Sequence, residues 1–224
     1  MPEIERKSSR SNKTISDLAK QVRILASDKE IKSKVDERIR EFERLRSRGG
    51  DGDWFSELCF CIMTANSTAQ LGMRIQRSLG RGCLTLSPKE VQELLRKHGH
   101  RFARPRAEYI CSARAHRRIK SVIESFPDDR TAREWLVKNI LGLGYKEASH
   151  FLRNTGHFDV AILDRHILRV MEEYSLIPHV PKTLTRKRYL EIEAELAKLA
   201  DRLNMPLGVL DLYLWYMRTG QILK

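Results

Sequence analysis

The chain has 224 residues, and its 42 Lys and Arg against 29 Asp and Glu give a formal net charge of +13. With 41% hydrophobic and 32% charged residues it can bury a core, it lacks any apolar run long enough to span a bilayer, and nothing in it resembles a signal peptide. The positive excess predicts a polyanionic partner, with the charged surface of a thermophilic or halotolerant protein as the alternative.

The N-terminal quarter predicts a tail followed by helices. Residues 1–12 are polar and without periodicity, which is typical of a flexible basic tail. Segments 14–25 and 30–47 carry apolar residues at helical spacing on a charged background. The Gly-rich run 48–53 predicts a break. Segment 54–65 is apolar nearly all round, so it is expected to form a buried central helix.

Two sequence patterns predict helix starts in the middle of the chain. In segment 87–99, Ser87 is the expected N-cap, Glu90 completes a capping box, and the final glycine ends the helix. Thr131 and Glu134 have the same spacing, which predicts a second capping box ahead of an apolar helix.

Helical patterns continue to the C-terminus. Segment 186–203 places leucines and an isoleucine on one stripe, and Pro206 opens a last helix that ends near Gly220. Strand alternation is not evident anywhere. We therefore expect an all-α fold of roughly nine to eleven helices.

The four cysteines, at positions 59, 61, 83 and 111, do not predict a metal site. None forms a CxxC pair, and none lies near the C-terminus, so a zinc or iron–sulfur site is not expected. Free thiols fit a reducing compartment, and we expect an intracellular protein of the cytoplasm or nucleoid.

Segment 135–156 predicts two helices joined by a tight turn. The first helix ends at the sequence LGLG, residues 141–144, and the second occupies 145–156. Gly142 and Gly144 permit positive φ and a close approach of the backbone to a partner. The N–H groups of such a turn, together with the start of the second helix, suit one DNA phosphate. We therefore predict a helix–hairpin–helix motif in which these two glycines contact DNA.

A lysine and an aspartate follow this turn at a spacing that suggests chemistry. Lys146 falls in the first turn of the second helix, where the helix dipole disfavours a cation and so favours a neutral, nucleophilic amine. Asp164, 18 positions later, precedes a periodic run and is an expected N-cap. A fixed carboxylate near an amine can stabilise a sugar that develops positive charge. The alternatives are a lysine that only contacts phosphate and an aspartate that only caps its helix.

At these residues the sequence resembles the helix–hairpin–helix DNA glycosylase superfamily, in which a lysine after the hairpin marks the bifunctional members. More specifically, it is similar to the archaeal-type (type 2) 8-oxoguanine DNA glycosylase/AP lyases in total length, in segment 57–69 and in its final lysine. It departs from the superfamily in lacking a Gly-Pro-Asp signature and a proline before the first hairpin glycine.

The resemblance implies roles for residues on the DNA side. Lys146 would be the Schiff-base nucleophile and Asp164 the catalytic carboxylate. His166 would contact backbone phosphate beside the lesion, although a lone histidine is more often structural. Asn66 holds the place from which the superfamily inserts a residue into the gap or reads the widowed cytosine, with a helix C-cap as the alternative.

The resemblance also implies the base-recognition residues. Phe102 and Trp215 would form the aromatic walls around the everted base, with a place in the ordinary core as the alternative for each. Asp211 interrupts an apolar helix, so it needs a partner, which the resemblance makes a base N–H. Lys224, the terminal residue, would place its carboxylate or amine against the oxidised purine.

The implied architecture has two helical lobes with the active site in the cleft between them. Residues 53–157 would form a central domain that contains the hairpin, and 13–52 plus 158–224 would form the other. The implied protein is a monomer that binds double-stranded DNA containing 8-oxoguanine, with no membrane association. No metal or redox cofactor is required, and a monovalent cation at the hairpin carbonyls is the one ion expected.

Three other functions fit part of the pattern. An oxidised-pyrimidine glycosylase of the endonuclease III type would usually have a C-terminal four-cysteine cluster, which is missing here. An alkyl-purine glycosylase would usually lack the lysine. A non-catalytic helix–hairpin–helix DNA-binding module would be shorter and often tandem. A panel of duplexes with different lesions separates them, because a pure binder releases no base.

Overall fold

The computed structural model describes residues 13–224, and the predicted tail, residues 1–12, lies outside them. The described part contains thirteen α-helices, one short 3-10 helix and no strand, which confirms the all-α class but exceeds the predicted number of helices. The helices are α1 (Ile15–Ser27), α2 (Lys29–Arg48), α3 (Asp51–Thr64), α4 (Ala69–Leu79), α5 (Gly82–Thr85), α6 (Pro88–Lys97), α7 (Ala103–Ala113), η1 (Arg114–His116), α8 (Ile119–Glu124), α9 (Asp129–Asn139), α10 (Tyr145–Asn154), α11 (Arg165–Glu173), α12 (Arg186–Leu203) and α13 (Leu207–Thr219).

Several helix starts agree with the sequence patterns, whereas those of α9 and α3 differ from them. Ser87 caps α6 with Glu90 in the predicted capping box. The predicted box of Thr131 is wrong, because the carboxylate of Asp128 accepts a bond from the Thr131 N–H and starts α9 earlier. The predicted break at 48–53 is also shorter than expected, since α3 already begins at Asp51.

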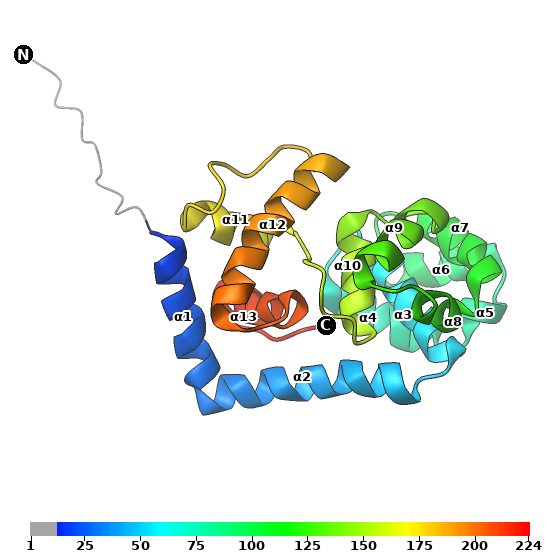
Figure 1. The fold of residues 1–224 in the computed structure, drawn as a ribbon. Helices are drawn as coiled ribbons and strands as arrows, with labels where there is room; N and C mark the ends of the chain where they lie inside the picture. The colour runs from blue at the N-terminus through cyan, green and yellow to red at the C-terminus, as the bar shows by residue number, and fades with distance from the viewer. Residues whose placement is uncertain (1–12) are drawn as a thin grey trace, which may run out of the picture.

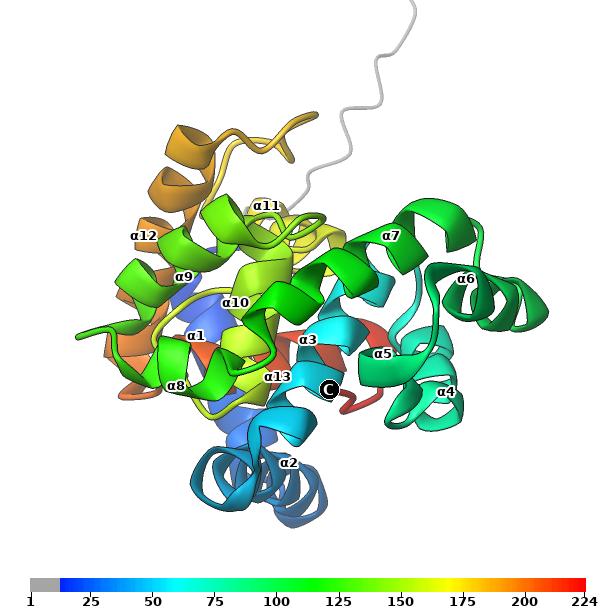
Figure 2. The same cartoon turned by 90° about the vertical axis from the view of Figure 1, so that its right-hand side faces the viewer.

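The helices pack around two separate cores, which Figure 1 shows as two groups, and Figure 2 looks onto the group α3 to α10 with the other group behind it. The central lobe, α3 to α10, surrounds α3, whose side chains from Trp54 to Thr64 are almost all buried. The terminal lobe combines α1 and most of α2 with α11 to α13, so it joins the two ends of the chain. The helix α2 runs along both groups in Figure 1 and contacts α10 and α13.

A largely buried segment without regular secondary structure, residues 157–164, connects the lobes by joining α10 to α11. The position of this segment sets how α10 of the central lobe lies relative to α11 of the terminal lobe. Within residues 13–224 no helix is long and apolar enough to cross a membrane.

Candidate active site

The predicted hairpin is present between α9 and α10. The first helix ends at Asn139, and Gly142 follows with φ of +85°, a left-handed conformation that favours glycine. A Cβ at this position would lie 2.4 Å from the ring of Tyr109 on α7. The turn therefore needs glycine both for its backbone conformation and for the packing of α7 against it.

Substitution of Gly142 by alanine is expected to lower stability more than the same change at Gly99. Gly99 also has a positive φ, +78°, but a Cβ added there would meet no heavy atom within 4 Å, so Gly99→Ala should lose about 1–2 kcal/mol from backbone strain alone. Gly142→Ala adds the overlap with Tyr109 and distorts the predicted phosphate site. Urea denaturation and affinity for undamaged duplex DNA measure the two effects. Equal losses at both positions would contradict the packing argument.

Lys146 is the second residue of α10, directly after the hairpin. Its side chain is 28% exposed, and its Nζ lies 3.6 Å from Oε1 of Glu147. The other carboxylate oxygen of Glu147 accepts the backbone N–H of Gly144 at 3.3 Å, so Glu147 closes the helix start in the manner of a capping box. The amine is thus held at a helix N-terminus on a partly open surface.

Asp164 is the N-cap of α11, as predicted. Its Oδ1 accepts the backbone N–H groups of His166 and Ile167, both at 2.8 Å. The carboxylate is half-buried, and its second oxygen takes no part in these two bonds. The cap fixes the position of the charge and leaves an oxygen for another contact.

A buried ion pair lies beside Lys146 and Asp164. Asp211 on α13 is 5% exposed, and Arg153 on α10 donates to its carboxylate. The pKa of Asp211 is raised to about 6, chiefly by burial; the charges of Arg153 and Lys146 act to lower it, and that of Asp164 acts to raise it. Arg153 shares α10 with Lys146, and α13, which carries Asp211, packs against α11, whose N-cap is Asp164. The ion pair therefore joins the helices that carry the two predicted catalytic groups.

The amine of Lys224 is anchored in the same region of the molecule. Its Nζ donates to Glu57 on α3 and to Gln76 on α4, at 2.7 Å each, and lies 4.5 Å above the ring of Phe60. Asn154 completes this arrangement by donating to the other oxygen of Glu57 at 2.6 Å. The terminal residue is therefore tied to the central lobe by its side chain.

The sequence analysis missed three of the buried polar residues that support this region. Glu57 had a recognisable signal, since it is the one acidic residue inside the apolar segment 54–65, and a buried carboxylate needs a partner. Arg153 and Asn154 gave no comparable signal, because polar residues at the end of an amphipathic helix are expected to be exposed. Both are buried here.

His166 and Trp215 lie together in the terminal lobe. Their ring centroids are 4.8 Å apart with the edge of one ring toward the face of the other. Both side chains are half-buried, and the indole Nε1 is buried without a hydrogen-bond partner. Asp211 occupies the preceding turn of the same helix, α13, so Trp215 lies at the edge of the site defined by Lys146 and Asp164.

Phe102 lies in the central lobe, just before α7, and is half-buried. The guanidinium of Arg101 lies 4.8 Å from the centroid of the Phe102 ring. The backbone N–H of Phe102 donates to the ring of His100. In the described residues 13–224, Trp215 forms its aromatic contact with His166 and not with Phe102. The two predicted walls thus come from opposite lobes and do not meet.

Asn66 is exposed just beyond the end of α3. Its φ of +59° places it in the left-handed region, which asparagine tolerates better than most residues. The preceding carbonyl, of Ala65, accepts a bond from Arg106 on α7 at 3.0 Å. The geometry suits the end of a helix and leaves the amide side chain facing outward, so both predicted roles of Asn66 stay open.

Buried His150 on α10 was not predicted as part of the site. Its ring packs edge-on against Phe60, with centroids 5.5 Å apart. Burial, followed by the charges of Arg153, Lys146 and Lys224, holds its pKa well below the usual value. The imidazole is therefore neutral, and it adds no positive charge beside the amine of Lys146. Among residues 13–224, no three His, Cys, Asp or Glu side chains gather in a way that could hold a metal ion.

The two lobes, the hairpin and the lysine that follows it define a helix–hairpin–helix DNA glycosylase. Comparison with known proteins gives the particular family. A family profile described as 8-oxoguanine DNA glycosylase matches residues 35–205. The 8-oxoguanine DNA glycosylase/AP lyase of Methanocaldococcus jannaschii is 54% identical over 87% of this chain and 94% of its own length. The corresponding protein of Korarchaeum cryptofilum is 51% identical over 85% of this chain and 90% of its own length.

Solved structures agree with the sequence relatives. A crystal structure of the M. jannaschii 8-oxoguanine glycosylase/lyase in complex with 15mer DNA containing 8-oxoguanine matches with a TM-score of 0.89 and 52% identity, over 92% of this chain and 99% of that one. The Thermotoga maritima 8-oxoguanine DNA glycosylase matches with a TM-score of 0.88 and 42% identity, over 94% of this chain and all of that one. The chain belongs to the 8-oxoguanine DNA glycosylase family.

Proposed function

We propose that this protein excises 8-oxoguanine from double-stranded DNA and then cleaves the strand at the resulting abasic site. The observation that supports this most directly is that an amine directly after the hairpin occurs together with a carboxylate that caps the next helix. Lys146 lies in the first turn of α10 and Asp164 is the N-cap of α11, and the ion pair of Arg153 with Asp211 joins α10 to the helix that packs against α11. A protein that only held DNA would need the hairpin but not this pair.

The reaction requires that the damaged nucleotide leave the duplex, because its sugar cannot be reached inside the stack. The excess of basic residues supplies salt-dependent affinity for the phosphate backbone. The amine of Lys146, once it has given up its proton, attacks C1′ of the sugar and displaces the base, while the charge of Asp164 stabilises the cationic character of the transition state. The C1′–O4′ bond of this adduct then opens, O4′ takes a proton, and a protonated imine remains at C1′. The imine acidifies the C2′ hydrogen, and loss of that proton expels the 3′ phosphate by β-elimination.

Recognition of the base requires an acceptor for the N7 hydrogen, which 8-oxoguanine has and guanine lacks. Asp211 and the terminal carboxylate of Lys224 are the two candidates. Asp211 already accepts from Arg153, whereas the bonds that anchor Lys224 use its side-chain amine. Arg153 occupies Oδ2 of Asp211 only, so Oδ1 of Asp211 is left for the purine contact. Phe102 and Trp215 would stack on the base from the two lobes, and Asn66, Gly142, Gly144 and His166 would contact the DNA.

The remaining expectations concern partners and ions. We propose a monomer inside the cell that works without a metal or redox cofactor, with a monovalent cation at the hairpin carbonyls. The chemistry above uses an amine, a carboxylate and water, so no step calls for a Lewis acid or an electron carrier.

Incubation with a panel of duplexes tests the function. The panel contains 8-oxoguanine, thymine glycol, an alkylated purine or no lesion, and each reaction is run with and without borohydride. We expect base release and a trapped covalent adduct on the 8-oxoguanine duplex. Preferential release of thymine glycol would favour the endonuclease III type, and binding without release from any duplex would favour a non-catalytic module.

A further inference from the structure

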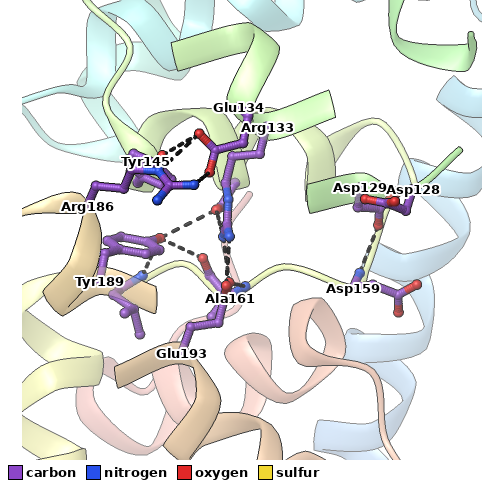
Figure 3. A network of polar contacts seen from close by, with 12 residues as sticks. Asp128, Asp129, Arg133, Glu134, Tyr145, Asp159, Ala161, Arg186, Tyr189 and Glu193 are labelled. Atoms are coloured by element: carbon purple, nitrogen blue, oxygen red, sulfur yellow. Dashed lines mark hydrogen bonds and ion pairs between the residues drawn. The ribbon is translucent and has the colours of Figure 1, made fainter. Parts of the chain in front are cut away.

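The segment that carries Asp164 between the lobes is held mainly by side chains, together with one backbone bond from Gly208 of α13 to the carbonyl of Phe158 at 2.8 Å. This strap, residues 157–164, belongs to no helix or strand, and the polar backbone groups of its buried part, residues 160–163, need partners. At its start, Asp129 on α9 accepts the backbone N–H of Asp159 at 2.9 Å (Figure 3) and contacts the ring of His157. The strap residues that are almost completely buried are Val160, Ala161, Ile162 and Leu163.

Two side chains of α12 hold the part of the strap nearest to Asp164. The hydroxyl of Tyr189 donates to the carbonyl of Ala161 at 2.7 Å and accepts the N–H of Leu163 at 3.3 Å. Glu193, one turn further along the helix, accepts the N–H of Ala161 at 2.8 Å. Figure 3 shows both side chains reaching the strap at Ala161. Three backbone groups within three residues of Asp164 are thus bound by α12.

The same side chains reach the helix that carries Lys146. Arg133 on α9 donates to both oxygens of Glu193, at 2.5 and 2.7 Å, and to the hydroxyl of Ser149 at 3.2 Å. The hydroxyls of Ser149 and Tyr189 lie 3.4 Å apart. Ser149 occupies α10, three residues after Lys146. These four residues, the interlobe cluster, connect the lysine helix to the aspartate strap.

The members of the cluster are among the most buried polar groups of the molecule, with Ser149 at 0%, Arg133 at 1%, Tyr189 at 2% and Glu193 at 3% exposure. A buried ion pair contributes little net stability, because the desolvation of both charges offsets their attraction. Apolar side chains would hold two lobes together at least as well. What the hydrogen bonds add is direction, since each bond fixes one backbone atom at one distance.

We propose that the interlobe cluster positions Asp164 relative to Lys146, so that Tyr189 and Glu193 are positioning residues for base excision. They touch neither the DNA nor the reacting atoms. Their effect on the reaction passes through the strap to the carboxylate. This inference rests on the proposed function, because it takes Asp164 as the group that stabilises the transition state.

A double-mutant cycle tests this inference. Tyr189→Phe removes the hydroxyl that binds the strap and keeps the ring. Its effect on single-turnover release of 8-oxoguanine is measured in the wild-type protein and in Asp164→Asn. We expect a loss of about tenfold in the first background, because a small misplacement of a catalytic group is costly, and less than about twofold in the second, where no charge remains to be misplaced.

Control variants separate positioning from general loss of structure. Tyr213→Phe changes another buried tyrosine, which lies outside the cluster on α13, and should leave the rate unchanged. Glu193→Gln provides a second probe of the strap if Tyr189→Phe folds poorly, and thermal unfolding confirms that each assay runs on folded protein. Affinity for the 8-oxoguanine duplex should stay within about twofold for both cluster variants.

The outcomes separate the positioning role of the interlobe cluster from the catalytic role of Asp164. Equal losses from Tyr189→Phe in both backgrounds, or no loss in either, would overturn the positioning role while leaving the catalytic role of Asp164 intact. A full rate in Asp164→Asn alone would overturn the proposed role of Asp164, and the inference with it.

Discussion

Replacement of Lys146 by glutamine is expected to abolish the covalent intermediate and the strand cleavage that depends on it. Glutamine is neutral and of similar length, and it favours a helix about as well as lysine does. It cannot form an imine with C1′. We expect no adduct after borohydride treatment and at least about a thousandfold slower release of 8-oxoguanine in single turnover.

The variant Lys198→Gln serves as the control for the loss of one positive charge. Lys198 is exposed on α12, where it pairs with Glu195 on the same helix, so its removal lowers the net charge by one without touching the site. The control should trap the adduct as the wild type does. Lesion-dependent cleavage at full rate by Lys146→Gln would refute the lysine mechanism.

Replacement of Asp164 by asparagine separates its two roles. Asparagine caps a helix about as well as aspartate, so α11 should keep its start. The negative charge is lost, and with it the stabilisation of the cationic transition state. We expect release of 8-oxoguanine to slow by about 100- to 1000-fold, as when one preorganised electrostatic group is removed. Single-turnover kinetics and thermal unfolding of the same samples measure the two roles.

Asp28 gives a matched control, because it caps α2 with the same geometry. Its Oδ1 accepts the N–H groups of Glu30 and Ile31 at 2.9 and 3.0 Å. Asp28→Asn should lower stability by the same small amount as Asp164→Asn, about 0.3–1 kcal/mol from the helix dipole, and leave the rate unchanged. A normal rate for Asp164→Asn would reduce that residue to a capping role.

The helical class was predictable because hydrophobic periodicity and capping signals are local properties of the sequence. The box at Ser87 and the cap at Asp164 are both present, since each needs only residues within one turn. The start of α9 was predicted wrongly for a similarly local reason: Asp128 competes with Thr131 for the cap and carries the stronger acceptor. The number of helices was too low because short pieces such as α5 leave no periodic signal.

In the candidate active site, the sequence could indicate only those residues whose type and local position are enough to suggest a chemical role. An amine after a hairpin and a carboxylate at a helix start can be recognised from spacing, and the structure places Lys146 in the first turn of α10 and Asp164 at the N-cap of α11. The bonds of Asp211 to Arg153 and of Lys224 to Glu57 join residues 58 and 167 positions apart. A single sequence has no signal for such pairings, because they depend on how the two lobes meet.

The two cores differ in how their residues are distributed along the sequence. The core around α3 draws on one uninterrupted stretch, from Trp54 to Val160, whereas the other combines Leu18 with residues as late as Leu214. During synthesis on the ribosome, contiguous units fold as soon as they emerge. The nascent protein would therefore carry its amine on a folded scaffold well before translation delivers α13, which completes the lobe of the carboxylate, so enzymatic activity would arise only at the last step of synthesis.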